Sequence, residues 1–163
     1  METSHSAIEN GAGTKPEADI FLKDGEIIDP GQGINGKGSI AIKDSKIQAI
    51  GPGLASDRAK VVLDMRGKIL APGLIDVHCH PAAGFSWLGV PPDEFGLPCG
   101  VTVIGAGGTS GAANFEAFRK LIIEPAKTEI FAFLNIAKAG LITLPEIHTS
   151  HDIDVELSRR VVE

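Results

Sequence analysis

Two histidines separated by one residue, His78 and His80, are the side chains of this sequence best suited to chemistry. They follow the apolar run Leu74–Val77 and the turn-forming pair Pro72-Gly73, a pattern that predicts a buried β-strand ending at the histidines. Because side chains alternate across a strand, both imidazoles should point to one face and Cys79 to the other. Both rings can then bind one divalent metal at about 2.0–2.1 Å, the zinc–histidine distance. The alternative interpretation is a solvated surface pair.

The whole stretch Pro72–His80 resembles the signature at the first barrel strand of the amidohydrolase superfamily, which includes dihydroorotases, cyclic amidases, ureases and N-acyl amino acid deacetylases. Gly100-Val101-Thr102, Ala112–Phe115 and Leu134-Asn135-Ile136 are similar to the deacetylase and dihydroorotase-like branch, so the resemblance runs from about Ala18 to the end of the chain. One departure is Gly105-Ala106-Gly107, where relatives commonly carry Asp-Ala-Gly.

The resemblance implies an α/β fold, the N-terminal portion of a (β/α)8 TIM-like barrel preceded by a small β-sandwich-type segment. It implies that His78 and His80 hold the first of one or two divalent ions, with zinc the expected metal. The implied activity is hydrolysis of a small-molecule amide or ester by a metal-activated water. The family's other parts, a carboxylated lysine, two histidines and an aspartate general base, come from later strands, so we expect no catalytic residue before Glu163.

Three segments are expected. Residues 1–17 are polar and should form a mobile tail. Residues 18–72 contain three hairpin-like pairs of short apolar runs, the first joined at Asp24-Gly25, the second at Asp44-Ser45 and the third at Met65-Arg66-Gly67. These pairs favour part of a β-sandwich, and any other antiparallel sheet remains an alternative.

Residues 73–163 should form the first βα units of the barrel. A short helix is expected from Pro92, and a strand over Gly100–Ile104 runs into a glycine-rich turn. A helix follows from about Ala113, with Phe115, Phe118, Leu121 and Ile122 on one face, and then a buried strand over Ile130–Leu134. This alternation implies parallel strands.

A complete barrel needs about 250 residues. We therefore expect this chain of 163 residues to be a fragment of an amidohydrolase that is not catalytic alone. Its open barrel edge should favour association with a second copy, and a truncated interaction protein without catalysis is one alternative function.

A nucleotide-binding α/β module is the other alternative. Gly105-x-x-Gly108-x-x-Gly111 between a strand and a helix resembles a dinucleotide-binding turn, in which backbone N–H groups approach a pyrophosphate. The next strand ends near Asn135, where an acidic ribose partner is expected, which weakens this interpretation.

Three further side chains have competing interpretations. Trp87, in the loop after His80, either lines a substrate pocket or covers the core. His148 and His151 form a His-x-x-His pair in polar surroundings, which favours a solvated loop over a second metal site. The following residues Asp152, Asp154 and Glu156 are typical of the capped start of a helix.

Composition excludes several classes of protein. A formal net charge of −6 argues against a nucleic-acid partner, and no apolar run approaches the roughly 20 residues of a membrane span. Two cysteines, Cys79 and Cys99, are too few for a disulfide framework. The start of the chain lacks the features of a signal peptide, so a cytoplasmic location is expected.

Overall fold

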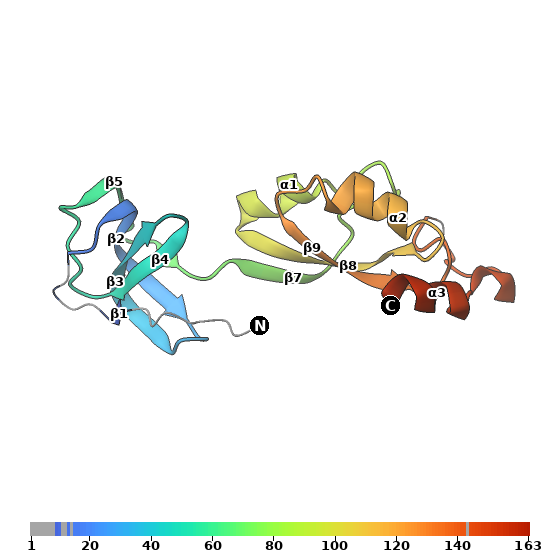
Figure 1. Cartoon of the computed structure of the whole chain (residues 1–163), viewed down its shortest axis with the longest axis horizontal. Coiled ribbons are helices and arrows are strands. Elements are labelled where there is room, and N and C mark those ends of the chain that lie inside the picture. The colour runs from blue at the N-terminus through green and yellow to red at the C-terminus, as the bar shows by residue number, and fades with distance from the viewer. Residues whose placement is uncertain (1–8, 11–12, 14, 143) are drawn as a thin grey trace. The chain divides into compact units, whose positions relative to one another are not determined.

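The computed structural model describes residues 9–10, 13, 15–142 and 144–163 and divides into two compact units, Met1–Pro72 and Gly73–Glu163 (Figure 1). The tail expected over residues 1–17 lies mostly outside the described residues. In its described part, Glu9–Asn10 forms β1 and the Lys15 ammonium lies 2.8 Å from the Asp57 carboxylate. No helix in the described part of the chain has the length and apolarity that a membrane span requires.

The first unit is one mixed six-stranded sheet. Its central path runs β1-β4-β3-β2-β5, and β6 also pairs with β2. The pairs β2/β3 and β3/β4 are antiparallel, whereas β5 and β6 both run parallel to β2 and β1 runs parallel to β4. The strands after β1 are β2 (Ala18–Asp29), β3 (Ile34–Lys43), β4 (Lys46–Gly51), β5 (Ala59–Asp64) and β6 (Ile69–Leu70).

Of the three expected hairpins, only the second is confirmed, as β3 and β4 joined at Asp44-Ser45. The third is wrong, because β5 and β6 pair with β2 and not with each other. The first is also wrong, since Asp24-Gly25 lies inside the continuous strand β2. There Leu22 pairs with Ile40 and Gly25 with Gly38, so β2 carries one extra residue, and Asp24 takes a left-handed φ of 59°. An Asp-Gly pair marks such a bulge as readily as a turn.

Strand β2 contributes to two apolar clusters, one on each side of the sheet. Phe21 is buried with Ala41 and Ala49, whereas Ile27 is buried with Ile40 and Ile50. Adjacent residues of β3 and of β4 thus supply different clusters, as alternation across a sheet requires.

The second unit contains three parallel strands in the order β7-β8-β9. The strand, helix, strand, helix, strand order expected from the sequence is confirmed, and this mixed α/β unit is consistent with part of a barrel. The strands are β7 (Leu74–Cys79), β8 (Val101–Gly111) and β9 (Glu129–Asn135), and the helices are α1 (Pro92–Phe95), α2 (Phe115–Phe118) and α3 (Val155–Val162), with 3₁₀ turns at Leu97–Cys99 and Ser150–Asp152.

The core of the second unit lies between this sheet and α2, which covers one of its faces (Figure 1). Phe118 is completely buried against Ile104 and Ala106 of β8 and Ile130 of β9. Leu121, expected on the same helix face, is instead 67% exposed. Residues 119–123 continue α2 as a π-type turn, which rotates the chain less per residue, so the spacing of an α-helix no longer brings residue 121 to the core.

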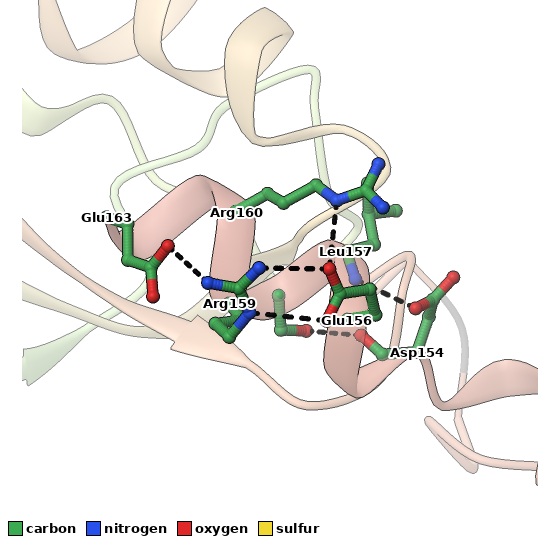
Figure 2. Close-up of polar contacts among 7 residues, drawn as sticks. Asp154, Glu156, Leu157, Arg159, Arg160 and Glu163 are labelled. Carbon is green, nitrogen blue, oxygen red and sulfur yellow. Dashed lines mark hydrogen bonds and ion pairs between the residues drawn. The ribbon is translucent and has the colours of Figure 1, made fainter.

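Helix α3 begins and ends with charged side chains, as the sequence predicts (Figure 2). The Asp154 carboxylate accepts a hydrogen bond from the Leu157 N–H at 2.8 Å and caps the first turn. Arg159 donates to Glu156 at 3.0 Å and also pairs with Glu163, and Arg160 donates to Glu156 at 3.2 Å. These pairs join residues one helical turn apart and support a short helix whose last turn is basic.

Replacement of Phe118 tests the core of the second unit. Phe118→Ala leaves a cavity under α2 and should lower the free energy of unfolding by about 3–5 kcal/mol. Leu121→Ala, three residues further along, is the matched control and should change it by less than about 0.5 kcal/mol. Urea unfolding followed by circular dichroism measures both, and equal losses would contradict the proposed core.

Two hydrogen bonds to the Asp93 carboxylate predict a pH dependence of stability. The Asp93 carboxylate of α1 accepts from the backbone N–H groups of Thr128 and Lys127, each at 2.9 Å, and these bonds hold the pKa of Asp93 below its usual 3.8. Because the folded pKa is the lower one, this stabilisation is complete above the unfolded pKa and is lost as pH falls through the folded pKa.

Asp93→Asn should therefore lower the urea midpoint at pH 7, and its difference from the unmodified chain should shrink at pH 3. Glu94→Gln, which removes the same charge from the neighbouring exposed position, is the control and should show no such convergence. A difference between Asp93→Asn and the unmodified chain that stays constant with pH would refute this role for the carboxylate.

Candidate metal centre

The two histidines lie at the carboxyl end of β7. His78 is within the strand and His80 follows it directly, and their ring centroids are 5.4 Å apart at an interplanar angle of 88°. Cys79, between them, packs against the cluster that contains Phe118, on the helix-covered face of the sheet. His78 therefore points to the opposite face, where two neighbouring imidazoles can supply nitrogen ligands to one ion.

The ring of His78 lies directly over Gly107 of β8. A Cβ atom at this position would lie 2.8–3.0 Å from the Cε1, Nε2 and Nδ1 atoms of His78, closer than side-chain contacts allow. A Cβ at Gly105, two residues earlier, would lie 2.7 Å from the backbone oxygen of Val77. The glycines of β8 thus make room for the backbone and the imidazole of β7.

The ring of His80 contacts the end of β8. Its Nδ1 lies 3.0 Å from the hydroxyl oxygen of Thr109, a residue that is completely buried. Burial lowers the pKa of His80, the nearby His78 lowers it further, and the carboxylate of Glu146 partly opposes this shift. A lowered pKa favours the neutral imidazole, which is the form that binds metals.

A third strand end adds polar groups beside this pair. The Asn135 side-chain amide, at the end of β9, donates to the Gly108 backbone oxygen at 2.9 Å and to the Glu146 carboxylate at 2.5 Å. Its carbonyl oxygen accepts from the Ala137 N–H at 2.9 Å. Asn135 thereby ties β9 to β8 and positions Glu146 beyond the strand ends.

The sequence interpretation assigned no role at the site to Thr109, Asn135 or Glu146. Thr109 and Asn135 are polar residues at the carboxyl ends of neighbouring parallel strands, the edge where such folds place their sites, and that signal could have identified both. Glu146 lies in an irregular segment that no local pattern relates to the strands.

The donor set fits the first half of a divalent-metal site. His78 and His80 provide two imidazoles, but within the described residues no group of three or more His, Cys, Asp or Glu side chains is arranged around one point. Trp87 is 63% exposed, so it does not cover the core, and its role at a substrate pocket stays a prediction. His148 and His151 are both exposed in a capped turn around Asp152, as expected for a solvated segment.

The glycine-rich stretch is not the turn that a dinucleotide site requires. Residues Gly105–Gly111 belong to β8, which pairs with β9 from Val103 to Gly111. A Cβ at Gly111 would lie 1.8 Å from the backbone oxygen of Ala137. The glycines therefore serve close packing between segments of the chain, which argues against the alternative of a nucleotide-binding turn.

Comparison with known proteins gives relatives of one kind. A deacetylase from Brucella anthropi is 40% identical over 85 residues, which are 50% of this chain and 21% of that protein. A solved dihydroorotase has a TM-score of 0.73 at 32% identity and is matched over 88% of this chain and 39% of its own. For a solved adenine deaminase the TM-score is 0.69 at 29% identity, over 90% and 38% of the two chains. No protein-family model matches the chain.

The fold of this chain is thus shared with part of a solved dihydroorotase and part of a solved adenine deaminase. These relatives belong to the amidohydrolase superfamily, the family that the sequence resemblance indicates. The chain spans about a fifth of the length of the matched deacetylase and about two fifths of each solved structure.

Two glycine substitutions test the close approach of β8 to β7. Gly107→Ala meets only the movable end of the His78 side chain, so the ring should turn away at little cost in stability. Gly105→Ala meets the Val77 backbone, which cannot move without disturbing the sheet, so it should cost about 1–3 kcal/mol.

Nuclear Overhauser contacts between the His78 and His80 rings report the first effect, and urea unfolding reports the second. Ring contacts that persist unchanged in Gly107→Ala, or equal stability losses in the two variants, would contradict this geometry.

Proposed function

We propose that this chain forms the first part of a metal-dependent hydrolase that cleaves a small-molecule amide or ester, as a deacetylase or a dihydroorotase does. We further propose that His78 and His80 bind a divalent metal, and that this metal is zinc. The observation that carries the proposal is the histidine pair at the carboxyl end of a parallel strand, on the sheet face opposite the helix. This is the edge at which barrel enzymes place their active sites.

A divalent metal held by these imidazoles supplies a Lewis acid that polarises the substrate carbonyl and activates water near neutral pH. The role of this chain is to present the nitrogen atoms of two neutral imidazoles in a fixed arrangement. His80 is suited to this by its lowered pKa and by its contact with Thr109, and His78 by the space above Gly107. We propose that the remaining ligands and the general base come from residues beyond Glu163 in a longer polypeptide.

The second candidate function, association without catalysis, is supported by apolar side chains that the second unit leaves exposed. Val77 of β7 is 70% exposed, and Phe131 and Phe133 of β9 are 60% and 63% exposed. The two phenylalanines alternate with Ile130 and Ala132, which face the helix-covered core, so they lie on the same face as His78. In a complete barrel further strands would adjoin this sheet; in the isolated chain, a second copy could do so.

Zinc titration tests the metal site directly. The chain should bind one zinc ion, measured by competition with a chromophoric chelator, and either His78→Asn or His80→Asn should weaken this affinity at least about tenfold because one of the two imidazole ligands is lost. His148→Asn, which removes an exposed imidazole outside the site, is the control and should leave the affinity unchanged. Equal affinity in all four proteins would reject the site.

Hydrolysis distinguishes the two candidate functions. With zinc, the 163-residue chain should release no acetate from N-acetyl amino acids, whereas a polypeptide that continues in frame beyond Glu163 should do so in a His78-dependent manner. A longer polypeptide that binds zinc but hydrolyses none of a panel of N-acyl amino acids, cyclic amides and esters would contradict the hydrolase. A stable dimer of the chain in light scattering would support association.

A further inference from the structure

The contact between His80 and Thr109 joins residues 29 positions apart in the sequence. The Nδ1 atom of His80 and the hydroxyl oxygen of Thr109 are 3.0 Å apart, an ordinary hydrogen-bond distance. In this contact the ring uses its Nδ1 atom within the protein, so its Nε2 atom is the one left for a ligand.

The direction of this hydrogen bond determines what Nε2 can do. If Nδ1 carries the proton and donates it to the threonine oxygen, Nε2 has a free lone pair and can bind a metal. If the hydroxyl donates to Nδ1, the proton of the neutral ring is on Nε2, which then cannot bind one. Histidines that bind metals generally donate from their other nitrogen to an oxygen, which fixes both the tautomer and the ring orientation.

The chain holds Thr109 firmly at this place. Its side chain is completely buried, and its backbone oxygen accepts a hydrogen bond from the Leu141 N–H at 3.1 Å. One residue earlier, the Gly108 oxygen accepts from the Asn135 side chain at 2.9 Å. These bonds tie the end of β8 to the end of β9 and to the following segment, so the backbone that carries the threonine hydroxyl is held in place.

The adjacent residue provides an internal comparison. Ser110 is 1% exposed, and its hydroxyl has no hydrogen-bond partner among the described residues. Two buried hydroxyls thus stand side by side at the end of β8, and of these the one at position 109 contacts the imidazole. Ser110 is therefore a matched control for Thr109, since it is a buried hydroxyl on the same strand that does not contact the imidazole.

We propose that Thr109 is a positioning residue of the metal centre, whose hydroxyl accepts the Nδ1 proton of His80 and so keeps the Nε2 lone pair available for the ion. The inference deepens the proposed function and rests on it for its purpose, but the hydrogen bond itself can be tested without metal. The residue acts through His80 and does not contact the ion.

Nuclear magnetic resonance of the metal-free chain gives the first test. Long-range ¹H–¹⁵N correlation of the imidazoles, at a pH where they are neutral, should show His80 mainly with its proton on Nδ1. Thr109→Val, which keeps the volume but removes the acceptor, should shift His80 toward the other tautomer, and Thr109→Ser should restore the original signature. Ser110→Ala should leave the His80 signals unchanged.

Zinc affinity of the same four proteins gives the second test. Thr109→Val should weaken binding about 10–100-fold, the usual effect of removing a partner behind a metal-bound histidine, while Thr109→Ser and Ser110→Ala stay close to the unmodified chain. Circular dichroism confirms that each variant is folded. If Thr109→Val does not fold, the tautomer of His80 in the unmodified chain decides.

The outcomes separate the inference from the proposed function. A proton on Nε2 of His80 in the unmodified chain, or zinc binding that Thr109→Val leaves unchanged, would overturn the role of Thr109 while the metal site stands. The expected tautomer in a chain that binds no zinc would support the hydrogen bond and refute the proposed metal site.

Discussion

The close approach of β7 to β8 is the constraint on which the candidate metal centre depends. Parallel strands of a sheet lie about 4.8 Å apart, and the side chains on one face must share the space above them. At Gly105 and Gly107 that space is given to the Val77 backbone and the His78 ring. The imidazole therefore lies against the peptide backbone of the neighbouring strand, and its position depends on the pairing of the two strands as well as on its own rotamer.

The second unit divides its side chains between two different tasks. The face covered by α2 buries small and medium apolar groups around Phe118, which hold the three strands together. The other face carries His78 together with Phe131 and Phe133, and the polar groups of Thr109 and Asn135 lie at the strand ends above them. The core and the candidate metal centre thus lie on opposite sides of one sheet, so changes at the histidine pair need not disturb the core.

Much of this arrangement could be predicted from the sequence, because the signals were local. The apolar run ending in His78 and His80, the alternation of strands and helices, and the acidic start of α3 each lie within a few residues of the element they define. Most of the errors originate in contacts between distant segments, and one originates in the local shape of a helix. A glycine-rich stretch that permits another strand to approach has the same composition as a glycine-rich turn. The exposure of Leu121 results from a local widening of its helix.

The site itself was only half predictable for the same reason. The histidine pair is visible as a motif, whereas the hydrogen bonds around it join distant residues. Thr109 and His80 are 29 residues apart in the sequence, and Asn135 and Gly108 are 27 residues apart. Such pairs become apparent only when the register of the strands is known, since a shift of one residue would exchange the two faces of β8.

The extra residue in β2 makes the first unit sensitive to changes in chain length. Phe21 and Ile27 are six residues apart and would share one face of a regular strand, yet they belong to different apolar clusters because the bulge at Asp24 intervenes. Deletion of a single residue there would restore strict alternation and turn one half of β2 over, which would remove that half from its cluster. Evolution of this segment should therefore proceed through substitutions, while insertions and deletions are confined to the loops between its strands.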